Sequence, residues 1–111
     1  MSRDEQAIEK EIRAKGLNAP RLSPEHINEQ IAREEWGRAS VLFGIDTDPM
    51  KCLTICVTTL KNGYTIVGKS ACASPDNYDP EIGGKIARED ARKQIWALEG
   101  YLLRSKLAAA R

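Results

Sequence analysis

The segment from Asp79 to Leu107 most constrains what this chain can fold into, because it predicts one long helix within only 111 residues. Asp79-Pro80-Glu81 is a favourable helix start: an aspartate N-cap precedes a proline whose missing N–H costs nothing in the first turn. At 100° per residue, this helix is apolar on two sides and therefore needs two packing partners. One side carries Gly84, Ala87, Ala91, Ile95, Leu98 and Leu102, and roughly the opposite side carries Ile82, Ile86, Trp96, Leu103 and Leu107.

The first partner is a predicted β-hairpin. The second is either the predicted helix that starts at Ser23 or another copy of the chain, and an oligomer is favoured. Residues 51–60 are β-branched and alternating, residues 64–72 form a second such run, and Asn62-Gly63 between them is the preferred two-residue turn. This turn would pair Lys61 with Tyr64, Thr59 with Ile66, Val57 with Gly68 and Ile55 with Ser70. We expect one face to form the core, with Leu53, Ile55, Val57, Ile66 and Cys72. The mixed face, with Thr54, Cys56, Thr58, Leu60, Val67 and Lys69, would meet solvent, a ligand or another subunit.

Gly83-Gly84 predicts a close approach between the long helix and this sheet. Each glycine costs a helix about 1 kcal/mol relative to alanine, so the pair needs a packing reason. The pair is not a phosphate-binding loop, because no Lys-Ser/Thr follows it in a strand-to-helix fingerprint.

The N-terminal half predicts two helices and one more strand. Residues 4–15 form a charge-rich helix with a thin apolar stripe, so segment 1–22 is expected to attach loosely. Ser23-Pro24-Glu25 starts a second helix that runs to about Glu35 or Trp36, and residues 38–45 form a strand. The chain is therefore expected to be a single α+β domain over residues 1–111. It would have a small antiparallel sheet with a central β-hairpin, packed by N-terminal helices and one long C-terminal helix.

Composition places the chain among ordinary soluble globular proteins, with 41% hydrophobic and 30% charged residues. The formal net charge is +1, which gives no global reason to bind nucleic acid. Residues 1–50 carry 7 Lys/Arg against 10 Asp/Glu, and residues 51–111 carry 10 against 6. We expect no membrane span and no export signal, and the odd count of three cysteines favours free thiols in a reducing cytosol.

Metal and catalytic chemistry are not favoured by the residues present. Cys52 and Cys56 would be about 13 Å apart on a strand, and His26 is the single histidine, so no metal site is expected. One histidine without a nucleophile-elbow sequence leaves no nucleophile–His–acid set. We therefore expect a protein that is not an enzyme and that carries no cofactor.

One group of residues could form a ligand site. Arg88 and Arg92 lie one helical turn apart with Lys85 nearby; they are either a solvated flank or a clamp for phosphate oxygens. Tyr64, Asn77 and Tyr78 could add stacking and amide hydrogen bonds if residues 74–80 fold over that flank. Specific binding of duplex DNA is not favoured, because the positive charge is neither clustered nor on a recognisable reading helix.

Residues 16–27, 58–89 and 91–103 resemble the small bacteriophage proteins of the gene-product-49 family. The resemblance implies a phage or prophage origin and action in the infected bacterial cytoplasm. The chain is also similar in plan to phage anti-defence sponges that counter the Thoeris system. Those proteins sequester cyclic ADP-ribose-type signals, and some also take up cyclic oligonucleotides, in pockets between subunits.

This second resemblance implies an oligomer, dimeric or larger, that binds a nucleotide-like signal without turnover. It implies that Tyr64 is the stacking aromatic, that Arg88 and Arg92 hold phosphate, and that Asn77 supplies the amide beside Tyr78. The rival hypothesis is a phage accessory protein that binds and modulates a host protein, with no small-molecule ligand. A third hypothesis is a weak nucleic-acid binder.

Overall fold

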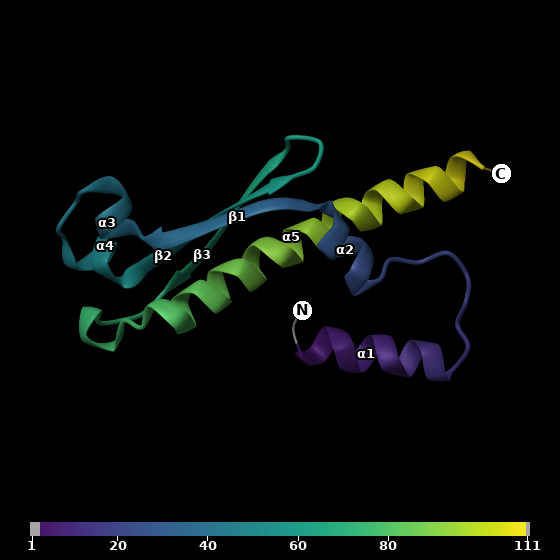
Figure 1. Cartoon of the computed structure of the whole chain (residues 1–111), viewed down its shortest axis with the longest axis horizontal. Coiled ribbons are helices and arrows are strands. Elements are labelled where there is room, and N and C mark those ends of the chain that lie inside the picture. Colours follow the sequence, from purple (N-terminus) through teal and green to yellow (C-terminus); the bar gives the residue numbers. More distant parts are fainter. Residues whose placement is uncertain (1–2, 111) are drawn as a thin grey trace.

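Residues 3–110 are described in a computed structural model, as a three-stranded antiparallel sheet with a long helix along it (Figure 1). The strands are β1 (Ile31–Arg38), β2 (Leu53–Leu60) and β3 (Thr65–Ala71), in the order β1-β2-β3. Helix α5 (Pro80–Ala109) contacts all three strands. The predicted α+β class, with a β-hairpin and a long C-terminal helix, is confirmed.

Helix α5 begins as its sequence predicts. The Asp79 carboxylate accepts a hydrogen bond from the Ile82 N–H at 2.9 Å, and Pro80 occupies the first turn. A helix of 30 residues is about 45 Å long, whereas strands of 8 residues span about 26 Å. The C-terminal part therefore extends past the sheet (Figure 1). For that reason Leu98 and Leu102, which were expected on the packed side, are 41% and 46% exposed.

The core lies where the first half of α5 crosses the sheet. At Gly68 of β3, an added Cβ would meet the Ala87 carbonyl oxygen and lie 2.6 Å from the Ala91 nitrogen. The helix backbone thus rests directly on the strand, and the predicted close packing at Gly83 and Gly84 is confirmed by their burial. The buried apolar cluster consists of Ile27, Cys56, Leu60, Ile66, Ala87, Ala91 and Ile95.

The hairpin forms and the predicted core residue Ile66 is buried, but the predicted register and the predicted core face of the first strand are wrong. Thr59 pairs with Thr65 and Val57 with Val67, one residue away from the predicted register. The Leu60 N–H donates to the Tyr64 carbonyl at 2.8 Å, so the turn has three residues. Gly63 has φ +90°, whereas no described non-glycine residue has a positive φ. A two-residue type I′ turn needs a positive φ at both central residues, which Asn62 does not have.

The face of β2 that packs against α5 is therefore the mixed one. Thr54, Cys56, Thr58 and Leu60 are buried, whereas the predicted core residues Leu53, Ile55 and Val57 are only half-buried. The helix selects this face because Gly68, opposite Cys56, is the strand position that lets α5 approach.

Two predictions for residues 24–52 are also wrong. Helix α2 (Pro24–Gln30) ends before Glu35, because residues 31–38 pair with β2 as β1. The strand predicted over residues 38–45 is the short helix α3 (Ala39–Phe43), which Gly44 ends with φ +65°. A second short helix, α4 (Asp48–Cys52), has Pro49 in its first turn and takes residues 51 and 52 from the predicted strand.

Side chains of α5 cover the outer edge of β3. The Asp90 carboxylate accepts the Lys69 N–H at 2.9 Å, and the Gln94 amide donates to the Val67 carbonyl at 2.7 Å. Two outward-facing backbone groups of this edge strand are therefore satisfied by the helix itself.

Helix α1 (Arg3–Ala14) lies beside α2, at the predicted position of the first helix. Among its described side chains only Glu9 is buried, and Ile8 is 57% exposed. Charged contacts hold the helix: Glu9 receives a hydrogen bond from Arg21 at 2.6 Å, and Glu5 receives one from Arg92 at 2.6 Å. No described helix is both long enough and apolar enough to cross a membrane.

Candidate functional site

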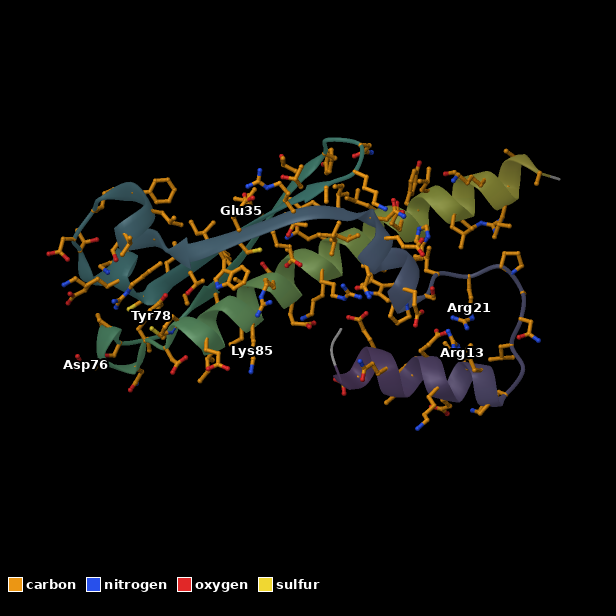
Figure 2. All side chains as sticks on the ribbon, viewed as in Figure 1. Arg13, Arg21, Glu35, Asp76, Tyr78 and Lys85 are labelled. Carbon is orange, nitrogen blue, oxygen red and sulfur yellow. The ribbon has the colours of Figure 1, made fainter. Side chains whose placement is uncertain are left out.

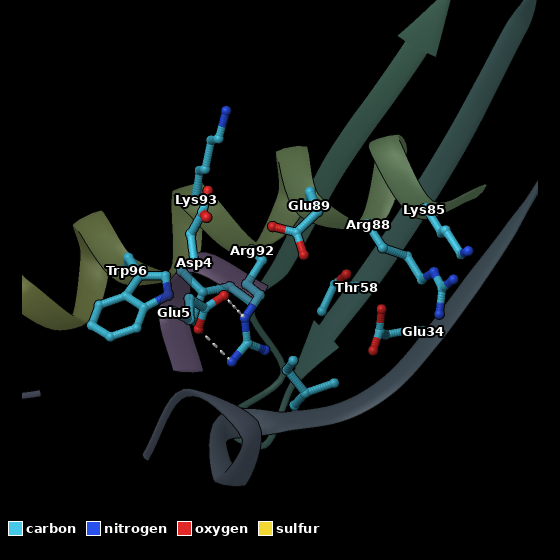
Figure 3. A pocket seen from close by; sticks show the side chains of 12 residues that line it. Asp4, Glu5, Glu34, Thr58, Lys85, Arg88, Glu89, Arg92, Lys93 and Trp96 are labelled. Carbon is cyan, nitrogen blue, oxygen red and sulfur yellow. Dashed lines mark hydrogen bonds and ion pairs between the residues drawn. The ribbon is translucent and has the colours of Figure 1, made fainter. Parts of the chain in front are cut away.

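A groove opens to solvent between α5, β1 and the start of α1 (Figure 3). Its volume is about 1010 Å³, which is large enough to hold a nucleotide-sized ligand. The groove is the place where the two predicted arginines meet other charged and aromatic side chains. Its lining residues are Asp4, Glu5, Ile31, Glu34, Thr58, Lys85, Arg88, Glu89, Arg92, Lys93, Ile95 and Trp96.

Arg92 lies at the inner end of the groove and is nearly buried, with 10% of its side chain exposed. Its Nε and Nη2 donate to the two carboxylate oxygens of Glu5 at 2.6 and 2.9 Å. Nη2 also donates to the Pro24 carbonyl at 3.3 Å. The guanidinium is therefore held in a fixed orientation, and it presents a two-pronged donor pair to a carboxylate.

Arg88 lies one turn earlier and is held by an indole. Its guanidinium carbon is 4.3 Å from the centroid of the Trp36 ring, and its Nε donates to the Gly84 carbonyl at 3.2 Å. Trp36 has room for this stack because position 84 has no side chain. Figure 3 shows the Glu34 carboxylate across from the Arg88 guanidinium. The indole takes the face of the guanidinium and the Gly84 carbonyl takes Nε, so the terminal N–H groups of Arg88, which lines the groove, remain as donors.

The charges of the groove are balanced. Four lining residues are cationic, namely Lys85, Arg88, Arg92 and Lys93, and four are anionic, namely Asp4, Glu5, Glu34 and Glu89. Two of the anionic residues belong to α1. Such a surface can bind a ligand that carries phosphate together with hydroxyl or amino groups, because both donors and acceptors face the same space.

The other predicted site residues lie outside the groove. Tyr64 is 56% exposed at the hairpin turn, where its N–H donates to the Asn62 side chain at 2.9 Å. Asn77 is exposed in η1 (Pro75–Asn77), and Tyr78 follows it near the start of α5 (Figure 2). The Arg38 guanidinium carbon lies 3.9 Å from the Tyr78 ring centroid. Tyr64 and Tyr78 thus lie near opposite ends of β3, and a single copy of the chain brings together only Arg88 and Arg92.

The cysteines and the histidine have structural partners. Burial raises the pKa of the Cys56 thiol, which lies 3.6 Å from the Thr58 hydroxyl. His26 Nε2 lies 2.8 Å from a Glu99 carboxylate oxygen. Within residues 3–110, no group of three or more His, Cys, Asp or Glu side chains is arranged to hold a metal ion.

Sequence reasoning missed Trp36, Glu34 and Glu5 as neighbours of the two arginines. Had residues 31–38 been interpreted as a strand, the period of two would have placed Glu34 and Trp36 on one face. No local pattern indicates Glu5, because it lies 87 positions from Arg92 in the chain.

Comparison with known families finds a match over residues 22–107, to the model described as the Phage protein (N4 Gp49/phage Sf6 gene 66) family. The match includes β1, the hairpin and nearly all of α5, and it begins after α1. No curated protein and no solved structure matches the chain.

Proposed function

Because the chain belongs to the N4 Gp49/phage Sf6 gene 66 family of phage proteins, we propose that it acts as a phage anti-defence protein in the host bacterial cytoplasm. It would sequester nucleotide-derived immune signals, such as cyclic ADP-ribose isomers or cyclic oligonucleotides. It would bind them without turnover, and so it would work by stoichiometry rather than by catalysis.

One observation carries this proposal: Arg88 and Arg92 line the same groove from successive turns of α5. Guanidinium groups bind phosphate oxygens through paired N–H donors, and both of these guanidinium groups are pre-positioned by contacts to Trp36 and Pro24. One turn separates the two arginines by about 5.4 Å along the helix, so a ligand with two phosphates could engage both once it displaces the Glu5 carboxylate from Arg92.

The proposed site is completed by a second copy of the chain. Tyr64 and the Asn77–Tyr78 loop do not line the groove of their own chain, and Tyr64 is exposed at the hairpin turn. In the proposed oligomer, one of these segments covers the groove of a neighbouring subunit and stacks on the base. Exposed apolar side chains on the helix and on the outer sheet face, among them Ile82, Ile86 and Val67, offer area for that contact.

A thermal-shift panel tests the proposal directly. We expect cyclic ADP-ribose isomers, cyclic dinucleotides or cyclic trinucleotides to raise the melting temperature, and the bound compound to be recovered intact after denaturation. If every compound in the panel leaves the melting temperature unchanged, nucleotide sequestration is excluded. Recovery of a cleaved compound would show an enzyme instead.

Arg88→Ala is the most informative variant for this test. Arg88 makes no ion pair within residues 3–110, so its removal should not lower the stability of the fold by leaving a partner charge unpaired. We expect it to lose the ligand-induced shift while its own melting temperature stays near that of the wild type. Arg104→Ala is the matched control, since Arg104 is an exposed arginine on the same helix beyond the sheet. Equal loss in both variants would indicate a general charge effect rather than a site.

A second candidate function, modulation of a host protein, is favoured by α3. Its consecutive residues Val41, Leu42 and Phe43 are 76%, 54% and 60% exposed. Exposed apolar groups that cluster in this way are typical of protein-binding surfaces. If this function is the correct one, Val41→Ser with Phe43→Ser abolishes a stoichiometric complex with one host protein, and Arg88→Ala leaves that complex intact.

A further inference from the structure

We propose that α1 is a displaceable plug, in which the Glu5 carboxylate occupies the place on Arg92 that an anionic ligand group takes. The proposal rests on the proposed function for the identity of the natural ligand, but the displacement itself concerns any anion that reaches Arg92. It assigns a function to the segment that precedes the family match, which begins at residue 22.

The geometry of the Glu5–Arg92 pair imitates ligand binding. Both Glu5 oxygens receive hydrogen bonds from Arg92, at 2.6 and 2.9 Å, and the side chains are only 14% and 10% exposed. A phosphate group binds a guanidinium through the same pair of parallel N–H···O bonds. While α1 is docked, Arg92 is nearly buried, so loss of the Glu5 charge leaves an unpaired buried charge, which is strongly destabilising. Arg92 must then gain another anion or be uncovered by the release of α1.

Helix α1 is attached in a way that permits its release. Its contacts to the rest of the chain are mainly ionic, through Glu5 to Arg92, Glu9 to Arg21 and Arg13 to Glu25. The buried apolar cluster of the described chain includes no residue of α1. The exposed residues 15–20 that follow it include Gly16 at φ +65°, so the connection to α2 can change direction without breaking core contacts.

Release of α1 changes the charge of the groove. With α1 in place, four cationic and four anionic residues line the groove. Asp4 and Glu5 leave with the helix, so the remaining lining has four cationic residues against Glu34 and Glu89, a net +2. The lining of the groove is therefore neutral when α1 is docked and cationic when α1 is released. A ligand must carry enough negative charge to replace the charges of Asp4 and Glu5.

Glu5→Gln tests the plug, with Glu11→Gln as the matched control. Glutamine at position 5 keeps the size of the side chain and removes the charge that pairs with Arg92. Glu11 is exposed, and its ion-pair partner is Lys15, one helical turn later, at 3.1 Å. Because a free helix of 12 residues is marginal in water, release of α1 should unfold it. Hydrogen–deuterium exchange of the α1 amides therefore reports release without any ligand.

We expect α1 in Glu5→Gln to exchange at least tenfold faster than in the wild type or in Glu11→Gln. Inorganic pyrophosphate is the probe for competition, compared with sodium chloride at matched ionic strength. It should raise α1 exchange in the wild type, and calorimetry should show that it binds Glu5→Gln at least tenfold more tightly. Unchanged α1 exchange in Glu5→Gln, or equal pyrophosphate affinity in the two proteins, would overturn the plug.

The nucleotide panel separates this inference from the proposed function. If pyrophosphate displaces α1 but no cyclic nucleotide binds the wild type or Glu5→Gln, the plug stands and nucleotide sequestration fails. If a cyclic nucleotide binds both proteins equally and leaves α1 exchange unchanged, sequestration stands and the plug fails.

Discussion

The indole of Trp36 packs against the α-carbon of Gly84, where an added Cβ would lie 2.5 Å from Trp36 Nε1. Gly84 therefore shapes the groove: it lets Trp36 lie flat beside α5 and under the Arg88 guanidinium. Gly84, a residue that helices ordinarily disfavour, thus helps to position Arg88 in the groove through Trp36.

Gly84→Ala should detach Trp36 from Arg88 while the fold survives. Trp36 is 45% exposed, so its ring can rotate toward solvent, and alanine restores about 1 kcal/mol of helix propensity. We expect a melting temperature close to that of the wild type, together with a red-shifted tryptophan emission. NMR would show the Arg88 side-chain protons losing their ring-current shift. If that shift persists, the packing of Trp36 does not depend on Gly84.

Gly68→Ala should be far more damaging than Gly84→Ala. Its Cβ would meet the Ala87 carbonyl and the Ala91 nitrogen, which are backbone groups that cannot move without displacing α5. We expect a loss of about 2–3 kcal/mol in the free energy of unfolding, the scale of overpacking in a core. Chemical denaturation measures it.

Gly100→Ala serves as the control for Gly68→Ala. Its nearest neighbour would be a Leu22 methyl carbon at 3.8 Å, an ordinary contact, so the substitution should stabilise the helix by about 0.5–1 kcal/mol. Equal effects at positions 68 and 100 would contradict the close approach of helix and strand.

The ionic attachment of α1 should weaken in acid. Hydrogen bonds from Arg21, and then from Arg13, lower the pKa of Glu9 from an ordinary 4.5 to about 2. Because the pKa is lower in the folded state, the ionised carboxylate stabilises the docked helix above about pH 4.5, and this contribution is lost as the pH falls through about 2. An NMR titration of the Glu9 carboxyl should have its midpoint near 2, and Arg21→Ala should move that midpoint upward. A wild-type midpoint near 4.5 would rule out this attachment.

Thr54→Val should stabilise the protein. The Thr54 hydroxyl is buried without a hydrogen-bond partner among the described residues, so its removal relieves a desolvation cost of about 1 kcal/mol. Thr58→Val is the matched control, because the equally buried Thr58 hydroxyl has the Cys56 sulfur as a partner at 3.6 Å. Denaturation of both variants measures the difference, and a loss of stability in Thr54→Val would contradict an unpaired hydroxyl at this position.

The sequence correctly predicted those parts of the fold that are determined by residues close together in the chain. The Asp79-Pro80 start and the apolar periodicity located α5 closely, because cap geometry and helix formation involve neighbouring residues. Residues 31–36 were misassigned because their charges and apolar residues fit a helix as well as a strand. Pairing with β2, which is distant in sequence, decides the outcome.

The hairpin register shows a finer limit of the same kind. Asn62-Gly63 is compatible with turns of two or three residues, and the choice shifts the pairing by one position. In this protein the turn has three residues, and the pairing that results places Gly68 opposite Cys56, in close contact with α5. For the groove, the spacing of Arg88 and Arg92 was visible in the sequence. Their partners Trp36 and Glu5 were not, because tertiary packing brings them there.

The covered edge of β3 has a consequence for how copies of this chain can join. With Asp90 bonded to the Lys69 N–H and Gln94 to the Val67 carbonyl, the middle of the outer edge of β3 is occupied, so β1 is the more open edge of the sheet. Joining β1 to β1 is isologous: it uses up the open edge of both copies and leaves a continuous sheet that ends at a covered β3 on either side. Growth through the sheet edge therefore closes at two copies. Helix α5 thus both packs the core and hinders the strand addition at β3 that open-ended growth would require.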